Sequence, residues 1–251
     1  MLIWVLVILV MAAVAFLGAW PFVVERRRLE IGPTERATAP GEFVALSQGV
    51  THFRWAGSAR GPVAIVVHGI ATPMISTQSI AAGLGRLGYR VLMYDLYGRG
   101  FSDAPEGRQD RKFFVRQLSD LCAYHGLTEE ITVAGYSMGG SIATAFATEY
   151  PHSVKHVIMV AGAGIATKES FFSRFCRVVP LLGDWVHAMF AHDRALKAIP
   201  ETAETREIGE VYQAQKRELT RLGYLPAILS SRRGLLSENQ EEDHRKLYRQ
   251  G

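Results

Sequence analysis

Residues 131–140 read Ile-Thr-Val-Ala-Gly-Tyr-Ser-Met-Gly-Gly, and this stretch decides the fold. Its first half is a short β-branched run, which is typical of a strand buried on both faces. The run passes directly into the pattern Gly135-x-Ser137-x-Gly139, and a helical pattern follows. A strand-to-helix turn this sharp holds its central residue strained and exposed, and only glycine leaves room two residues to either side. We therefore expect the Ser137 hydroxyl to project over the edge of a sheet.

The apolar runs around this stretch predict a sheet of the α/β class that is mostly parallel and doubly wound. Similar buried-strand patterns occur at Val63–Val67, Val91–Tyr94 and Val154–Val160, and a predicted hairpin of Glu42–Leu46 and Val50–Trp55 precedes them. Helical patterns separate the runs, at Thr77–Leu87, Gln109–His125 and Gly140–Thr148. Alternation of this kind predicts right-handed crossovers with helices on both faces. Ligands of such sheets bind beyond the carboxyl ends of the strands, where Ser137 would lie.

Beyond Ala161 the pattern changes to helices without strands, which predicts a helical insertion over the sheet. The predicted helices cover 170–179, 184–199, 204–222 and 226–231. Six large apolar side chains in this region either line a pocket or pack on the core, and we expect core packing for most of them. These six are Phe171, Phe172, Phe175, Trp185, Met189 and Phe190.

Two backbone amides are candidates to stabilise an anion beside Ser137. The helix that begins at Met138 turns its positive end toward the hydroxyl, and the Met138 N–H can donate to a developing oxyanion. A second donor must come from a neighbouring turn, and His68-Gly69-Ile70 follows the strand Val63–Val67. The N–H of Ile70 fits this role. We expect His68 to order the loop, with a role as catalytic base as the alternative.

Three motifs, in the order given below, make this sequence resemble members of the α/β-hydrolase superfamily, in the branch of lidded serine esterases and monoacylglycerol lipases. They are His68-Gly69, then Asp95-x-x-Gly98-x-Gly100-x-Ser102, then Gly135-x-Ser137-x-Gly139-Gly140. The resemblance covers about 42–233. It implies that Ser137 is the nucleophile, that Ile70 and Met138 form the oxyanion hole, and that a lid begins just after Ile165. His68, Gly69, Gly135 and Gly139 would support these groups, and Asp95 would cap its turn.

The resemblance also identifies what the chain lacks. Family members continue past the lid with two strands that carry an acid and a histidine. Residues 235–251 contain no apolar strand, so we expect those two strands to be missing and Val154–Val160 to form an open edge. Five other histidines do not suggest a catalytic base, and we expect them to be surface or hydrogen-bonded residues; they are His152, His156, His187, His192 and His244, the last beside Asp243. No histidine and carboxylate spacing suggests a metal, and we expect no cofactor.

The first 24 residues carry no charge and are long enough to cross a hydrocarbon layer of about 30 Å. The cluster Arg26-Arg27-Arg28 directly follows, which predicts a single-pass membrane protein with its main domain in the cytoplasm. A cleaved signal peptide is the alternative. The expected organisation is an anchor at 1–24, a linker at 25–41, an α/β core at 42–165, a helical lid at 166–233 and a polar tail at 234–251.

The composition excludes several classes of protein. Two cysteines far apart in sequence cannot form a disulfide framework or a four-thiolate zinc site, and a net charge of +4 implies no basic face for nucleic acid. We therefore expect a membrane-anchored serine hydrolase that cleaves ester or other acyl bonds of small-molecule, lipid-like substrates through an acyl-enzyme on Ser137. The alternative is a truncated or degenerate member of the superfamily that binds without turnover.

Overall fold

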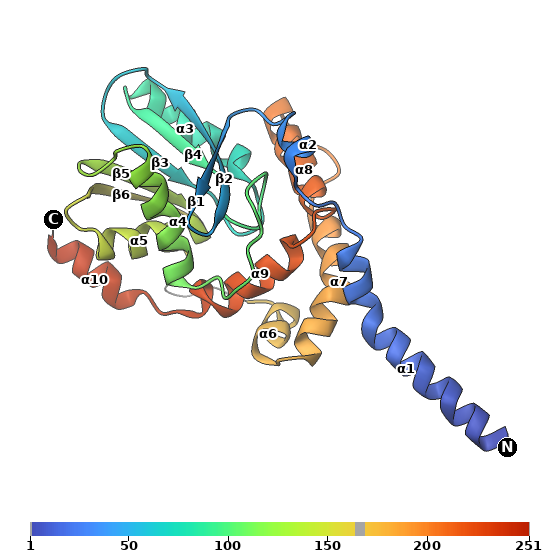
Figure 1. Cartoon of the computed structure of the whole chain (residues 1–251). Coiled ribbons are helices and arrows are strands. Elements are labelled where there is room, and N and C mark those ends of the chain that lie inside the picture. Colours follow the sequence, from blue (N-terminus) through green and yellow to red (C-terminus); the bar gives the residue numbers. More distant parts are fainter. Residues whose placement is uncertain (1, 164–168, 251) are drawn as a thin grey trace.

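The computed structural model describes residues 2–163 and 169–250, and its centre is a six-stranded sheet (Figure 1). The strand order is β1-β2-β4-β3-β5-β6. β2 pairs antiparallel with β1 and β4, whereas β4, β3, β5 and β6 are parallel neighbours. The strands are β1 (Glu42–Leu46), β2 (Gly49–Gly57), β3 (Val63–Val67), β4 (Arg90–Tyr94), β5 (Ile131–Tyr136) and β6 (Val154–Val160). The predicted mostly parallel α/β sheet is confirmed.

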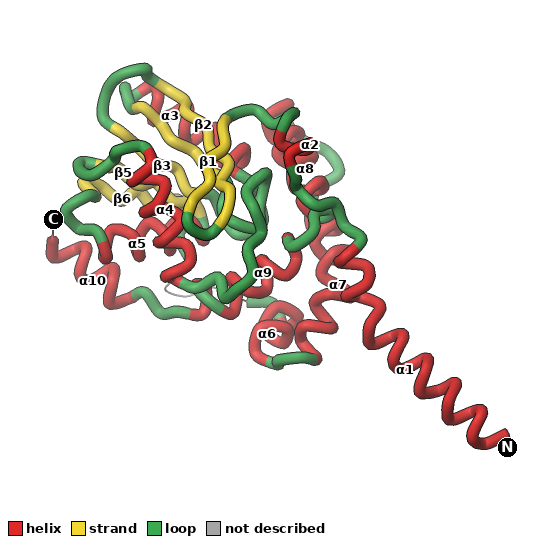
Figure 2. The backbone as a smooth tube through the Cα atoms, viewed as in Figure 1, coloured by secondary structure: helices red, strands yellow, loops and turns green. Residues whose placement is uncertain are grey.

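Helices cover both faces of this sheet (Figure 2). Alternate strand side chains such as Ile65 and Leu92 pack on one face with α4 (Arg111–Tyr124) and α5 (Met138–Glu149). Their neighbours in sequence point to the other face, where they pack with α3 (Gln78–Arg86), which the short 3-10 helix η1 (Met74–Thr77) precedes. Because successive strand residues point to opposite faces, uninterrupted apolar runs are what a sheet covered on both sides requires.

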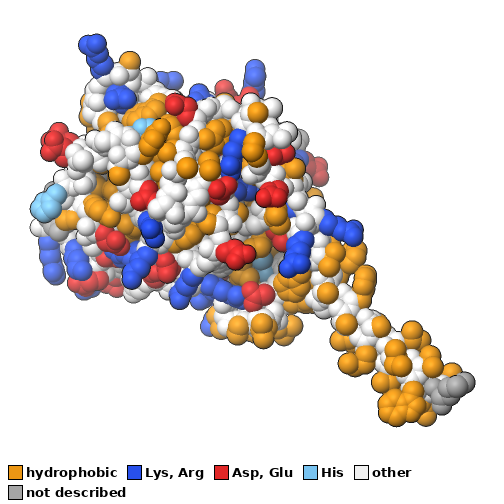
Figure 3. Space-filling model, in the orientation of Figure 1, with side chains coloured by type: hydrophobic (Ala, Val, Ile, Leu, Met, Phe, Trp, Pro, Cys, Tyr) orange, Lys and Arg blue, Asp and Glu red, His pale blue; other side chains and the backbone are white. Residues whose placement is uncertain are grey.

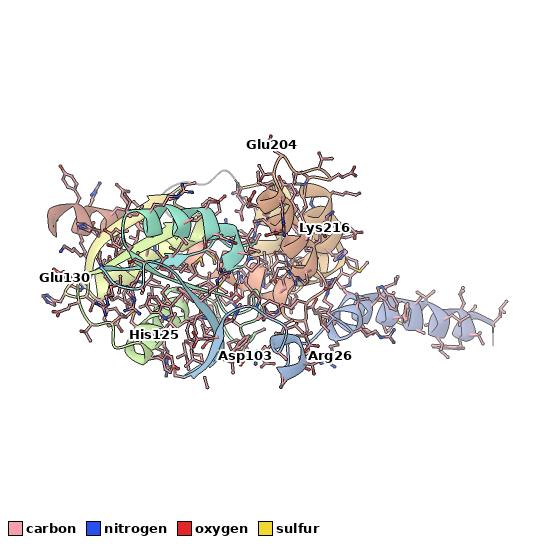
Figure 4. The ribbon with its side chains drawn as sticks, turned by 90° about the horizontal axis from the view of Figure 1, so that it is seen from above. Arg26, Asp103, His125, Glu130, Glu204 and Lys216 are labelled. Carbon is pink, nitrogen blue, oxygen red and sulfur yellow. The ribbon has the colours of Figure 1, made fainter. Side chains whose placement is uncertain are left out.

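The predicted helical lid follows β6 and consists of α6 (Phe171–Val178), α7 (Leu182–Ala198), α8 (Arg206–Glu218) and α9 (Tyr224–Arg233). The boundary expected at 165–166 lies outside the described residues. In Figure 4, Lys216 of α8 lies far from Glu130, which precedes β5, so α8 is at the carboxyl ends of the parallel strands. The prediction that most of the six large apolar lid residues pack in the core is wrong. Phe171 and Phe190 are exposed, and Phe172, Phe175, Trp185 and Met189 are only partly buried.

The N-terminal helix α1 (Leu2–Arg26) projects away from the domain (Figure 1). It is the one helix in the described ranges long and apolar enough to span a membrane, and a signal sequence has the same properties. The segment after it, the expected linker, is ordered by contacts with the lid. It contains the short helix α2 (Pro33–Arg36), and the Leu29 N–H donates to the Thr220 carbonyl at 3.0 Å while the Leu222 N–H donates to the Leu29 carbonyl at 2.8 Å. This segment is therefore hydrogen-bonded to the lid.

The C-terminal segment, expected to be a polar tail, is polar in composition and is packed against the domain. It forms a second 3-10 helix, η2 (Leu235–Ser237), and then α10 (Glu241–Gln250), which contacts α5. Gln240 is fully buried, and its Nε2 donates to the Ser141 carbonyl at 2.9 Å. Within the described residues β6 pairs only with β5 and is an edge of the sheet. That two further strands are missing stays a prediction.

Candidate active site

Ser137 lies at the turn between β5 and α5 with φ 52° and ψ −117°, a conformation that residues other than glycine rarely adopt. Its side chain is half-buried. The flanking glycines are required by sterics. A Cβ at Gly135 would approach the Gly139 carbonyl oxygen to 2.2 Å, and a Cβ at Gly139 would approach the Val67 oxygen to 2.1 Å. The strained turn expected from the sequence is present.

Backbone hydrogen bonds fix this turn to the end of β6. The Ser137 N–H donates to the Val160 carbonyl at 3.0 Å, and the Ser137 carbonyl accepts from the N–H groups of Ala163 and Gly140 at 3.1 and 2.9 Å. A positive φ in a serine costs free energy and persists only when surrounding contacts hold it. These three bonds supply that support, so the hydroxyl has a defined position.

The loop after β3 lies directly beside this turn. A Cβ built on Gly69 would be 3.5 Å from the Ser137 Cβ, so the loop backbone passes next to the serine side chain. His68 is fully buried, and its Nε2 accepts the Leu96 N–H at 2.9 Å while its Nδ1 donates to the Gly69 carbonyl at 2.8 Å. Burial lowers the pKa of His68 to about 4, which keeps the ring neutral. Both nitrogens are occupied, so His68 orders the loop and is unsuited to act as a base.

The two candidate oxyanion donors are available. Neither the Ile70 N–H nor the Met138 N–H has a hydrogen-bond partner among the described residues. The first N–H groups of a helix have no partner within the helix, and Met138 begins α5. Amides without partners, one at the start of α5 and one in the loop beside Ser137, suit an anion that forms there.

Arg99 is a residue of this site that the sequence did not reveal. It is fully buried, and its Nε donates to the Ile70 carbonyl at 3.1 Å. Its Nη1 donates to the Tyr97 carbonyl at 2.8 Å, and its Nη2 donates to the Ser231 hydroxyl at 2.7 Å. Arg99 therefore connects the candidate oxyanion loop to α9 of the lid. An arginine in a glycine-rich turn normally indicates a solvated side chain, so the pattern gave no signal for this contact.

Asp95 caps its turn, in agreement with the sequence. Its carboxylate accepts from the N–H groups of Met74 and Phe101 at 2.7 and 3.0 Å, and it lies 2.6 Å from the Nδ1 of His52. Burial alone would raise the pKa of Asp95, but the contact with His52 outweighs it and the pKa is lowered. A Cβ at Gly100 would approach this carboxylate to 1.9 Å, which explains that glycine. The buried partner His52 was not anticipated.

No histidine or acid in the described residues hydrogen-bonds to the Ser137 hydroxyl. His187 is buried with Nε2 3.0 Å from the Leu225 carbonyl, and burial lowers its pKa to about 4. Four other histidines have other surroundings. His192 contacts Asp193, and His152 and His156 are exposed around β6. His244 is in α10 beside Asp243, which pairs with Arg111. The structure therefore does not assign a general base. Within the described ranges no group of His, Cys, Asp or Glu side chains could hold a metal ion.

Comparisons with known proteins identify the family. A family model described as the alpha/beta hydrolase fold matches residues 62–250, and the chain belongs to this family. Lipase 1 of Psychrobacter immobilis is 30% identical over 163 residues, which are 55% of this chain and 51% of the lipase. The chain spans between about a third and a half of the curated relatives that it matches.

Solved structures support the same fold. The crystal structure of Cfl2 from Burkholderia cenocepacia aligns with a TM-score of 0.66 at 20% identity, covering 84% of this chain and 75% of that one. The enol-lactonase from Burkholderia xenovorans LB400 aligns with a TM-score of 0.62 at 18% identity, covering 80% and 76%. At these identities the likeness concerns the fold.

Proposed function

We propose that this chain is a membrane-anchored serine hydrolase that cleaves ester or related acyl bonds through Ser137. The observation that carries the proposal is the strained Ser137 turn, next to Gly69 and flanked by the unpartnered N–H groups of Ile70 and Met138. This arrangement supports the proposal because acyl transfer requires a nucleophile with oxyanion donors beside it. A lipase among the relatives supports the choice of ester substrates.

In the proposed reaction the Ser137 oxygen attacks the carbonyl carbon of the substrate, and the carbonyl oxygen becomes an oxyanion. The amides of Ile70 and Met138 donate to that oxygen, assisted by the positive end of α5. Collapse of the intermediate breaks the bond to the leaving alcohol and forms the acyl-enzyme, and water then releases the acid. A general base must accept the serine proton, and the structure does not assign one.

The proposal is tested with the purified full chain and a series of p-nitrophenyl esters of increasing acyl length. Wild-type protein should release nitrophenolate faster than Ser137→Ala at every length it accepts. Equal rates for the two proteins would refute the assignment of Ser137. An oxyanion hole alone retains about 10³- to 10⁴-fold acceleration over water, so the comparison with Ser137→Ala is the informative one.

A binding protein without turnover is the second candidate. It is favoured by one observation: no histidine in the described residues reaches Ser137. In that case the wild type and Ser137→Ala would hydrolyse esters equally slowly, and calorimetry would still detect binding of an ester to both.

We also propose that α1 is retained as a single-pass anchor with the α/β domain in the cytoplasm. The uncharged stretch 2–24 of α1 and the positive cluster Arg26–Arg28 that follows it support this orientation. A bilayer location favours lipid-like substrates, which enter an apolar lid readily. Mass spectrometry of the protein extracted from membranes tests retention, because a cleaved signal peptide would remove about 2 to 3 kDa.

A further inference from the structure

The lid exposes a continuous set of large apolar side chains. We name five of them the lid tip; they are Phe171, Val178, Leu181, Leu182 and Phe190, from α6, α7 and the turn between these helices. Phe171 and Leu181 are 84% and 85% exposed, and the other three are 47% to 59% exposed. Single exposed apolar residues are ordinary, but several large ones on two helices in contact and on the turn between them mark an interaction surface.

The lid tip adjoins the N-terminal helix. The Trp185 Nε1 on α7 donates to the Leu17 carbonyl on α1 at 3.1 Å, and the two helices pack together. Figure 3 shows hydrophobic side chains gathered at the lower edge of the domain over α6, close to where the hydrophobic surface of α1 begins. Because the two apolar surfaces adjoin, the environment that surrounds α1 is the first candidate to cover the lid tip as well.

The position of the Trp185 contact along α1 indicates what covers the lid tip. A hydrocarbon layer of about 30 Å needs about 20 helical residues at 1.5 Å per residue. Every stretch of about 20 residues within the uncharged part of α1, 2–24, contains Leu17 with at least four residues after it. Leu17 therefore lies about 6 Å or more inside the apolar layer. Trp185 is hydrogen-bonded to Leu17 and therefore reaches the boundary of that layer, and α7 begins only three residues before it.

Charged side chains around the lid tip fit the headgroup region. Arg26 ends α1 and Arg27 follows it, and both are exposed, as are Arg174 on α6 and Arg194 on α7. The exposed acid Asp193 is close to Arg194 in sequence and contacts His192. Four exposed guanidinium groups beside an apolar surface suit contact with anionic lipid headgroups, which attract basic residues.

We propose that the lid tip inserts into the interface of the same bilayer that α1 crosses, so that the protein contacts lipid at two places. This inference rests on the proposed anchor and goes beyond it. Insertion places the lid helices at the membrane surface, and lipid-like molecules would meet the lid before they meet water. Trp185 then belongs to the aromatic belt at the interface.

The test uses spin labels on the full chain in single-copy nanodiscs that contain phosphatidylglycerol and phosphatidylcholine. Labels are placed by Leu181→Cys in the lid tip, Leu9→Cys in α1 and Arg60→Cys in the turn before β3, each in a background with the two buried cysteines replaced by alanine. Collisions with oxygen report lipid, and collisions with a water-soluble nickel chelate report solvent. Circular dichroism confirms that each variant is folded.

The proposal predicts a several-fold loss of nickel collisions at position 181 relative to position 60, with oxygen collisions as frequent as at position 9. Frequent nickel collisions at position 181 would overturn it, because the surface would then face water. Shielding from both reagents would also overturn it, since the surface would then be covered by protein. Failure of the anchor itself is distinct, because position 9 would then collide with nickel.

Discussion

Replacing Ser137 with glycine should stabilise the protein while abolishing hydrolysis. The φ of 52° and ψ of −117° lie outside the wells open to residues with a Cβ, and such strain costs about 1–3 kcal/mol. The Ser137 side chain makes no capping hydrogen bond at the start of α5, so its removal loses no such bond. Glycine also makes the unfolded chain more flexible, at about 0.4–1 kcal/mol. The net expectation is a gain of about 1–2 kcal/mol.

The measurement is urea unfolding of the full chain in detergent micelles, and the difference between glycine and alanine variants is the informative quantity. Arg116 provides the matched control because it is exposed within α4. At Arg116 glycine should be about 1 kcal/mol less stable than alanine, as in any helix interior. At Ser137 glycine should be the more stable of the two. A Ser137→Gly variant that is no more stable than Ser137→Ala would refute the strain argument.

Three further variants test other parts of the account by urea unfolding. Arg99→Ala should lose about 3 kcal/mol or more, because it leaves several buried acceptors unpaired, including the Ile70 carbonyl; a loss below about 1 kcal/mol contradicts this. Gly139→Ala should prevent folding or cost a similar amount, since its Cβ has no space. Burial raises the pKa of Glu218 to about 7, above its unfolded value, so the wild type should lose stability as the pH rises from about 4.5 to 7. Glu218→Gln should remove that loss, and an unchanged pH profile would contradict the assignment.

The sequence predicted the parts of this site that depend on local pattern. Buried strands, the turn at Ser137 and its two glycines follow from residues adjacent in the chain, because sterics within a few residues determine them. The strand Glu42–Leu46 and the strand Val154–Val160 have the predicted bounds. Helix ends differ by one to four residues, which is usual where caps are weak.

The sequence did not predict contacts between distant segments. The hydrogen bonds between Leu29 and the lid join residues about 190 positions apart, and no local pattern encodes them. Arg99 lies in a glycine-rich segment whose composition is typical of a surface turn, yet α9 and the loop that contains Ile70 enclose its side chain. For Phe171 and Phe190 the amphipathic pattern showed that each helix has an apolar face, but not what covers that face.

The central proposal is that Ser137 is the nucleophile, and covalent labelling tests it most directly. The full chain is treated with a fluorophosphonate probe and digested, and the modified peptide is identified by mass spectrometry. The account predicts one adduct on Ser137, and no adduct in Ser137→Ala. Equal labelling of the two proteins, or an adduct on another residue, would contradict it.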